Sequence, residues 1–485
     1  MKRHHALAIV CFTGLSLSGC MVGPKYVKPT VPVAPAFKEQ PPESFKDSDG
    51  WKPAQPGDSA LRGNWWEIFG DPQLNALEEQ VALSNQDLKV AEARFRQARA
   101  MIRFNRSAQF PTITTTPTIA NERLSANQPY FPQALANNGT GAYTLPLDLS
   151  YEVDLWGKIR RTVSASREEA QASAADLQTA NLSLHAELAV DYFELRSADD
   201  QQQVLDDTVK AYTDALKLTQ SRFDGGAAPK SDVAEAKTQL DGAQVQDTDI
   251  AVMRSQYEHA IATLIGKPPA EFTIKPAPKT ALQLPVIPVG LPSSLLERRP
   301  DIAAGERRVA EANDQIGIAR AAFFPSLVLG ATGGFTGTTI ANLFNWPSRM
   351  WAVGGQASQI IYDAGRRRAV SEGAIANYDG TVASYRQTTL TAFQEVEDNL
   401  AALRILEKEA RQQQEATASA QESLQLFTNR YEGGVDNYLQ VITAQTVLLT
   451  NQRNDIDIER RRMDASVLLV KAIGGGWDTS QLPSF

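Results

Sequence analysis

The feature that most constrains this chain is an internal repeat. The peptide Arg222–Gly226 (RFDGG) returns as Arg430–Gly434 (RYEGG), 208 residues later in a sequence of 485 residues. Length alone would favour about three globular domains of ~150 residues each. Glycines recur at the same spacing before and after both copies of the peptide: Gly157, Gly365, Gly266 and Gly474. The shared spacing instead predicts one unit of roughly two hundred residues that occurs twice in tandem.

Each copy contains two long stretches with helical periodicity. No proline occurs between Gly157 and Pro229, and large apolar residues from Leu177 to Phe223 recur at alternating steps of three and four, as in coiled coils. At ~1.5 Å per residue such a helix is on the order of 100 Å long, too long for a compact domain. The Gly-Gly pair ends it, and a return helix follows. The pattern predicts long helices over about 158–223, 231–265, 366–430 and 436–472. Thr446, Arg453 and Arg460 interrupt the apolar seam of the last one.

A different periodicity precedes each first long helix. From Tyr143 to Leu155 the odd positions are apolar, whereas the even positions include Asp148, Glu152 and Asp154. This period of two predicts a strand with one apolar and one acidic face, and the threonine-rich segment 112–124 is its expected hairpin partner. The predicted strands cover about 112–124, 143–156, 326–338 and 350–362. Pro117, Pro146 and several glycines weaken the pattern, so the edge of a soluble β-sandwich is an open alternative.

Four strands of this length fit the thickness of an outer membrane but do not close a barrel. Lipid tolerates no open sheet edge, and bacterial barrels have at least about eight strands. Three chains would supply twelve strands and twelve long helices. The apolar strand face would then meet lipid and the acidic face would line water, which predicts a hollow conduit.

The N-terminus has the features of an export signal. A basic start at Lys2 and Arg3 is followed by a short apolar run that ends in Leu17–Cys20 (LSGC), a sequence similar to a bacterial lipobox. We therefore expect a signal peptide at 1–19 and an acyl chain and a diacylglycerol on Cys20. Met21 follows the cysteine instead of the aspartate typical of inner-membrane retention, which favours the outer membrane. The proline-rich segment 20–62 is expected to be an extended tether rather than a packed element.

Several classes of function are disfavoured by composition and by missing motifs. The formal net charge of −8 argues against a general nucleic-acid binder. The only two cysteines, Cys11 and Cys20, leave no disulfide framework or cysteine-built metal site. The two histidines beyond the signal, His185 and His259, lack a metal-ligand spacing, and neither a GxSxG elbow nor a GxxxxGK loop occurs. We expect no metal, no cofactor apart from the lipid on Cys20, and no enzyme activity.

Five segments together resemble the outer membrane factor family of tripartite efflux systems of the RND type, in its lipoprotein branch. They are Cys20–Pro29 (CMVGPKYVKP), Trp65–Leu77 (WWEIFGDPQLNAL), Arg298–Leu327 (RRPDIAAGERRVAEANDQIGIARAAFFPSL), Arg430–Leu439 (RYEGGVDNYL) and Ile473–Trp477 (IGGGW). The resemblance implies an α+β membrane protein. Its fold would be a homotrimeric twelve-strand transmembrane β-barrel, four strands per chain, continued by a long periplasmic α-helical barrel. It also implies a periplasmic adaptor and an inner-membrane pump as partners.

The resemblance also assigns roles to residues. The two helix-turn-helix tips would dock on the adaptor, through Arg222, Phe223, Gly225 and Gly226 and through Arg430, Tyr431, Gly433 and Gly434. The periplasmic aperture would be closed by Leu439, Thr443 and Thr446. Relatives often carry an aspartate at the second position and a basic residue at the third, so two threonines here favour a gate closed by apolar packing at Leu439.

These observations give one domain arrangement and one function, with alternatives. The expected order is signal peptide 1–19, lipidated tether 20–62, first repeat 63–266, proline-rich linker 267–292, second repeat 293–474 and tail 475–485. The expected function is a passive outer-membrane exit duct for drugs or other small molecules. The alternatives are the exit duct of a protein-secretion system, and a lipid-anchored coiled-coil scaffold with no pore.

Overall fold

The computed structural model describes residues 21–42, 63–123, 125, 127, 139–277, 284–287 and 292–485. The expected signal peptide at 1–19, the lipidation site Cys20 and residues 43–62 lie outside the described residues.

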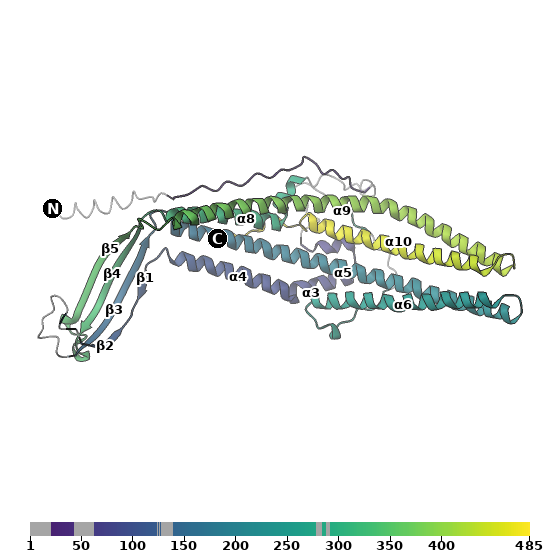
Figure 1. Cartoon of the computed structure of the whole chain (residues 1–485), viewed down its shortest axis with the longest axis horizontal. Helices are drawn as coiled ribbons and strands as arrows, with labels where there is room; N and C mark the ends of the chain where they lie inside the picture. The colour runs from purple at the N-terminus through teal and green to yellow at the C-terminus, as the bar shows by residue number, and fades with distance from the viewer. Residues whose placement is uncertain are drawn as a thin grey trace.

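Two helical hairpins of equal size dominate the molecule (Figure 1). Helices α5 (Lys158–Asp224) and α6 (Lys230–Leu264) form the first hairpin, and α9 (Arg366–Glu432) and α10 (Tyr438–Ala472) form the second. Both first helices have 67 residues and both return helices have 35. Their bounds agree with the predicted ranges to within two residues, because proline-free heptads fix where such helices can run.

Glycines set the ends of both hairpins in the same way. Gly157 and Gly365 cap the first helices with φ of 79° and 89°, and Gly226 and Gly434 form the tip turns with φ of 72° and 73°. This left-handed conformation costs other residues energy but suits glycine. The repeat seen in the sequence is therefore a repeat of backbone geometry.

One antiparallel sheet lies at the opposite end of the molecule from the hairpin tips (Figure 1). It runs in the order β1-β3-β4-β5, with β2 also paired to β3. Strands β1 and β2 form one free edge and β5 forms the other. The strands are β1 (Thr112–Thr114), β2 (Thr118–Glu122), β3 (Thr140–Val153), β4 (Ser326–Gly337) and β5 (Arg349–Ser358).

The predicted hairpin partnership of the two segments in the first repeat is confirmed, but three of the four strand predictions differ from the structure. Strand β3 covers Thr140–Val153 rather than 143–156. Segment 112–124 is not one strand, because Pro117, which has no N–H to donate, separates β1 from β2. The last strand ends at Ser358 rather than near 362.

The two faces of the sheet differ in chemistry. Along one face Ile113, Leu149, Ala331 and Val353 are successive cross-strand partners, and Ile113 and Val353 are 66% and 76% exposed in the single chain. On the other face Thr332 Oγ1 donates to Asp148 Oδ1 at 2.6 Å. The apolar face that the sequence of β3 predicts thus extends across the sheet, whereas the opposite face is polar mainly on β3 and carries Met350 and Ala352 on β5.

Three helices were not predicted from periodicity. They are α3 (Pro72–Ser84), α4 (Gln86–Ser107) and α8 (Pro300–Ala321), and the short α7 (Leu295–Arg298) precedes α8. Asp71 caps α3 by accepting from the backbone N–H groups of Gln73 and Leu74. Short 3-10 segments complete the chain: Trp65–Phe69, Pro269–Glu271, Pro292–Ser294, Ile340–Asn342, Trp346–Ser348 and Thr479–Gln481.

The main hydrophobic core lies where these helices meet the long ones. It includes Leu74 and Val81 of α3, Leu188 of α5, Val309 of α8 and Val467 of α10, all fully buried. Ile274 and Ile287 of the proline-rich linker, and Trp477 of the C-terminal tail, are also buried. The linker and the tail are therefore both anchored in the body of the protein.

The described part of the expected tether is packed, which corrects the sequence interpretation. Its backbone is extended over residues 21–42, but Tyr26, Val31 and Phe37 lie against the core. Glu397 accepts from the backbone N–H groups of Lys38 and Glu39. Proline content predicted the extended backbone, but these partners are hundreds of residues away in sequence and could not be predicted from the segment itself.

Candidate functional site

The tips of the two hairpins lie against each other. Arg222 Nη1 donates to the backbone oxygen of Tyr431 at 2.9 Å, and its guanidinium lies 4.5 Å from the centre of the Tyr431 ring. Tyr431 in turn contacts Tyr438, with ring centres 5.1 Å apart, in a small cluster with Val441 and Ile442. Both hairpins therefore contribute to one joined tip, which includes Arg222 and Tyr431 from the set that sequence analysis assigns to adaptor docking.

The two tip arginines make different contacts despite their equivalent places in the repeat. Arg430 pairs with Asp436 of its own turn, Nε to Oδ2 at 2.6 Å, whereas Arg222 reaches across to the other hairpin. Phe223 and Val435 are 37% and 69% exposed. The joined tip thus offers apolar side chains and a charged pair at the extreme end of the molecule.

The predicted aperture residues form an exposed stripe at the start of α10. Leu439 is 53% exposed, and Thr443 and Thr446 are exposed as well. Thr443 Oγ1 donates to the Leu439 carbonyl at 2.9 Å, and Thr446 Oγ1 to the Ile442 carbonyl at 3.0 Å. Because both hydroxyl protons stay on their own helix, Leu439 is the side chain of this stripe best suited to apolar contact with another chain.

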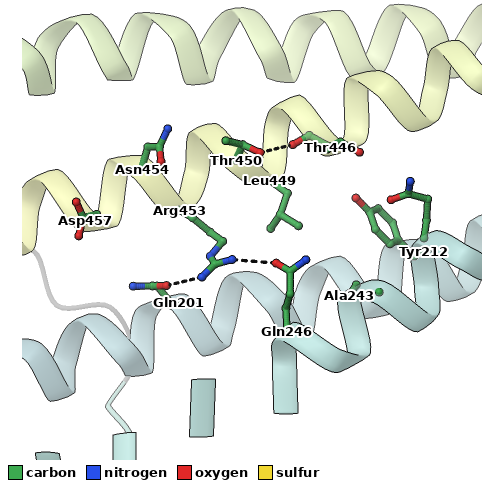
Figure 2. A pocket seen from close by; sticks show the side chains of 12 residues that line it. Gln201, Tyr212, Ala243, Gln246, Thr446, Leu449, Thr450, Arg453, Asn454 and Asp457 are labelled. Atoms are coloured by element: carbon green, nitrogen blue, oxygen red, sulfur yellow. Dashed lines mark hydrogen bonds between the residues drawn. The ribbon is translucent and has the colours of Figure 1, made fainter. Parts of the chain in front are cut away.

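Next to this stripe, with Thr446 in its wall, the hairpins line an open polar cavity of about 380 Å³ (Figure 2). Arg453 of α10 spans it, donating to Gln246 Oε1 of α6 at 2.9 Å and to Gln201 Oε1 of α5 at 3.2 Å. Sequence analysis detected only that Arg453 interrupts the apolar seam of its helix. The sequence could not show that Arg453 bridges the hairpins, because its partners Gln201 and Gln246 are about 200 or more residues away.

A second group of charges lies further along the same helices. Arg460 pairs with Glu194 of α5 and with Asp457 and Asp464 of α10. Burial and the nearby Glu194 carboxylate raise the pKa of Asp464 to about 7. Burial and the carboxylates of Glu187 and Glu194 raise the pKa of Asp191 to about 6. The wall between α5 and α10 therefore carries acids that bind protons near neutral pH.

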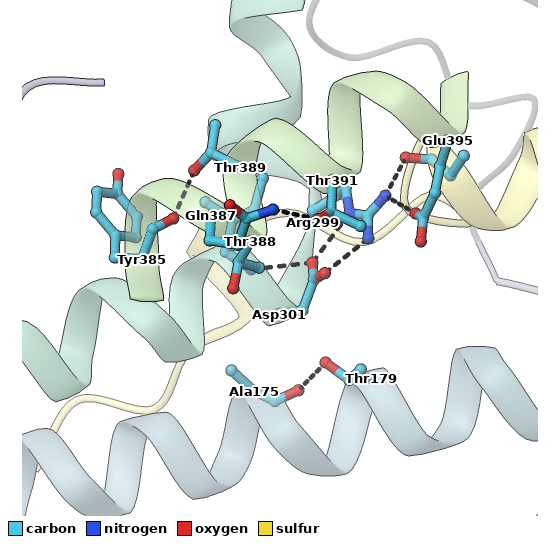
Figure 3. Close-up of polar contacts among 12 residues, drawn as sticks. Ala175, Thr179, Arg299, Asp301, Tyr385, Gln387, Thr388, Thr389, Thr391 and Glu395 are labelled. Carbon is cyan, nitrogen blue, oxygen red and sulfur yellow. Dashed lines mark hydrogen bonds and ion pairs between the residues drawn. The ribbon is translucent and has the colours of Figure 1, made fainter. Parts of the chain in front are cut away.

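The segment that begins at Arg298 lies where α8, α9 and α10 meet (Figure 3). Arg299 pairs with Asp301 at 2.6 Å and with Glu395 of α9 at 2.5 Å, and it donates to the carbonyl of Ala472 at the end of α10. Gly474, with φ of 96°, lies so close to the Arg298 carbonyl that a Cβ there would be 2.1 Å from its oxygen. These residues hold α8, α9 and α10 together.

His185 is buried in the core. Its Nδ1 lies 2.6 Å from Glu78 Oε2, and its ring stacks on Trp66 with 4.3 Å between centres. Burial raises the pKa of Glu78 to about 9 and lowers the pKa of His185 to about 4, so both groups are neutral at pH 7 and Glu78 donates the hydrogen bond. Across the described ranges, no group of three or more histidine, cysteine, aspartate or glutamate side chains is placed to hold a metal ion.

Within the described part of the chain, no helix is both long and apolar enough to cross a membrane.

Comparison with known proteins identifies the family. The family described as outer membrane efflux protein matches residues 77–267 and 291–475, one match in each repeat. The probable efflux pump outer membrane protein TtgC of Pseudomonas putida is 31% identical over 97% of this chain and 96% of its own length. The pyoverdine export outer membrane protein OpmQ of Pseudomonas aeruginosa is 30% identical over 86% of this chain and 88% of its own.

Solved structures give the same result. The outer-membrane channel OprN matches with a TM-score of 0.85 and 30% identity, over 94% of this chain and all of its own. The CmeC outer membrane channel of Campylobacter jejuni matches with a TM-score of 0.87 and 25% identity, over 95% and 96% of the two chains. The chain therefore belongs to the outer membrane efflux protein family, and it is an outer-membrane efflux channel protein.

Proposed function

We propose that three copies of this chain form the exit duct of a tripartite efflux pump, which carries small molecules passively across the periplasm and the outer membrane. The observation that supports this most strongly is the two-faced sheet with two free edges, set at one end of two hairpins whose first helices have 67 residues. At ~1.5 Å per residue those helices reach on the order of 100 Å from the membrane.

The free edges determine how many chains are needed. Strand β5 at one edge ends at the helical junction and β1 at the other edge starts there, so β5 of one chain can pair antiparallel with β1 of the next. A sheet in lipid must close because its edge groups find no water. Counting β1 and β2 as one interrupted strand, three chains give twelve strands, well above the minimum of about eight.

The position of the joined tip, at the far end of the molecule from the sheet, supports the assignment of partners. The joined tip lies furthest from the sheet, where an adaptor protein and an inner-membrane pump of the RND type could meet it (Figure 1). The duct itself acts without catalysis, so the pump supplies the energy. Relatives are named for export of antibiotics, toluene and pyoverdine, which favours small organic cargo over secreted proteins and over a scaffold without a pore.

Lipidation of Cys20 is part of this proposal. The backbone N–H of Val22 donates to the Trp156 carbonyl at 3.1 Å, and Met21 lies against Gly157, where the sheet joins α5. A lipid on the preceding residue would therefore enter the periplasmic leaflet beside the sheet. Multiple acyl chains anchor stably, whereas one acyl chain does so only marginally.

A host that lacks its own copy of the gene tests the proposed function. Complementation with this chain is expected to lower the accumulation of a fluorescent dye to the wild-type level when adaptor and pump are present. Complementation without the pump should leave accumulation high. Equal accumulation with and without the channel gene would contradict the assignment.

A further inference from the structure

Five arginines at one end of the helical body have exposed side chains and, within the described residues, no ion pair. We call them the basic collar: Arg103 and Arg106 of α4, Arg320 of α8, and Arg366 and Arg368 of α9. They come from three helices that all meet the sheet at this level (Figure 1). Such a cluster is unexpected in a chain whose formal net charge is −8.

Other basic residues at the same level are already neutralised, which sets the collar apart. Lys158 pairs with Glu152 at 3.1 Å, Arg160 with Asp154 at 3.1 Å, and Arg367 with Asp363 at 2.6 Å. Glu152, Asp154 and Asp363 are thus engaged by residues outside the collar, and one exposed acid, Glu372 of α9, lies a turn beyond Arg368. The collar needs anions from another source.

The collar lies directly beyond the apolar face of the sheet. Between the two is a belt of aromatic side chains: Trp156 stacks on Phe324 with 4.6 Å between ring centres, and Phe110 and Phe323 are exposed. Aromatic residues favour the boundary between hydrocarbon and water. The collar therefore lies at the depth of the headgroups of the periplasmic leaflet.

Closure of the ring, which rests on the proposed function, brings the collar residues of neighbouring chains together. Where β5 of one chain pairs with β1 of the next, the start of α9 meets the end of α4, because β1 follows α4 and β5 precedes α9. The first turn of α9, which carries Arg366 and Arg368, then lies beside the end of the helix that carries Arg103 and Arg106. Like charges at such a seam repel each other unless an anion lies between them.

We propose that anionic phospholipids of the periplasmic leaflet bind at the basic collar, with their phosphate groups bridging the seam between adjacent chains. Arginine presents a planar fork of donors that matches a phosphate group, and each basic residue near an anionic membrane surface contributes favourably to binding. The acyl chains of the same lipid lie along the aromatic belt and the apolar face of the sheet.

Native mass spectrometry of the full-length assembly tests the proposal. The purified protein is equilibrated in detergent with equal amounts of phosphatidylglycerol and phosphatidylethanolamine, and the lipids retained on each oligomer are counted. The wild type is expected to retain phosphatidylglycerol preferentially. The variants Arg103→Gln/Arg106→Gln and Arg366→Gln/Arg368→Gln, one on each side of the seam, are each expected to lower that preference about fivefold or more.

A matched control removes two arginines elsewhere. Arg94 and Arg411 are exposed and, in the described part of the chain, have no ion pair. Arg94 lies about 18 Å from Arg106 along α4 at ~1.5 Å per residue. Arg94→Gln/Arg411→Gln is expected to leave the lipid preference unchanged. Inorganic phosphate added at millimolar concentration is expected not to displace the retained lipid.

The outcomes separate this proposal from the proposed function. Absence of a trimer in the wild type would contradict the proposed function. A trimer with no preference for phosphatidylglycerol, an equal loss in the control, or full displacement by phosphate would overturn the lipid site alone. An altered anion selectivity of the pore in both collar variants with unchanged lipid retention would also overturn it, because the collar would then face the duct.

Discussion

At the scale of single residues, equivalent positions of the repeat have acquired different contacts. Arg222 and Arg430 share one sequence context, yet one joins the two hairpins and the other pairs within its own turn. Sequence could predict both as tip residues because the Gly-Gly turn defines the tip. It could not distinguish them, since the contact of Arg222 depends on how the hairpins pack.

Arg222→Ala is expected to loosen the joined tip. The substitution removes a cation-aromatic contact and a charge-assisted hydrogen bond between hairpins, so amide protection over 433–438 should fall on the order of tenfold. Hydrogen exchange measured by mass spectrometry checks this. Arg430→Ala is the matched control: it removes a pair within its own turn and should lower amide protection at the C-terminal end of α5 less than Arg222→Ala does. Equal effects of the two variants at that end of α5 would refute the distinction.

The pair Glu78–His185 predicts a pH dependence of stability. The pKa of Glu78 is raised to about 9 in the folded protein, so the unfolded chain loses the proton first and stability falls as pH rises above ~4.5 towards 9. The pKa of His185 is lowered to about 4 in the folded protein, so the unfolded chain gains the proton first. Stability therefore also falls as pH falls below ~6.5.

Glu78→Gln is expected to reduce the decline in folding stability between pH 6.5 and 9. The neutral amide can donate the same hydrogen bond to His185 Nδ1 without titrating. The apparent melting temperature, followed by circular dichroism, should fall by a few degrees per pH unit in the wild type and less in the variant. Identical slopes would show that Glu78 is ionised in the folded protein.

Leu439 carries the predicted apolar gate. Leu439→Ala is expected to raise the single-channel conductance of the lone channel and the antibiotic permeability of cells that express it, because a smaller side chain leaves the aperture less tightly closed. Leu468→Ala, an exposed leucine near the other end of α10, is the control and should change neither. Unchanged conductance in Leu439→Ala would refute the apolar gate.

At the scale of elements, the sequence predicted what local periodicity encodes and missed what tertiary contacts decide. The four long helices were predicted to within two residues because their heptads run without proline. Helices α3, α4 and α8 were not predicted: part of α3 and all of α8 lie in segments of the family resemblance, and α4 lies in none of them. The packed course of residues 21–42 depends on distant partners such as Glu397, and the bridge made by Arg453 needs Gln201 and Gln246.

Arg453 is expected to determine how firmly the two hairpins stay together behind the aperture. Arg453→Leu removes both bridging hydrogen bonds. The distribution of distances between spin labels on α6 and α10, placed in the halves nearer the joined tip, should therefore broaden. Double electron-electron resonance measures that distance. Arg411→Leu on α9 serves as control, and an unbroadened distance in Arg453→Leu would show that apolar packing alone holds the hairpins.

At the scale of the whole molecule, the proposed barrel would hold the protein in the membrane, and the proposed lipid on Cys20 would add to that hold. Cys20→Ser is therefore expected to remain in the outer membrane and to require detergent for extraction. Fractionation with carbonate and then with detergent checks this, with the wild type as reference. Release of Cys20→Ser without detergent would favour the scaffold with no pore.

The central claim is that one chain supplies one third of a closed barrel. The mass of the detergent-solubilised complex, measured by native mass spectrometry, tests it most directly. The expected mass is that of three lipidated chains, because only closure pairs the edge at β1 with the edge at β5. A stable monomer or dimer inserted in the membrane would contradict it.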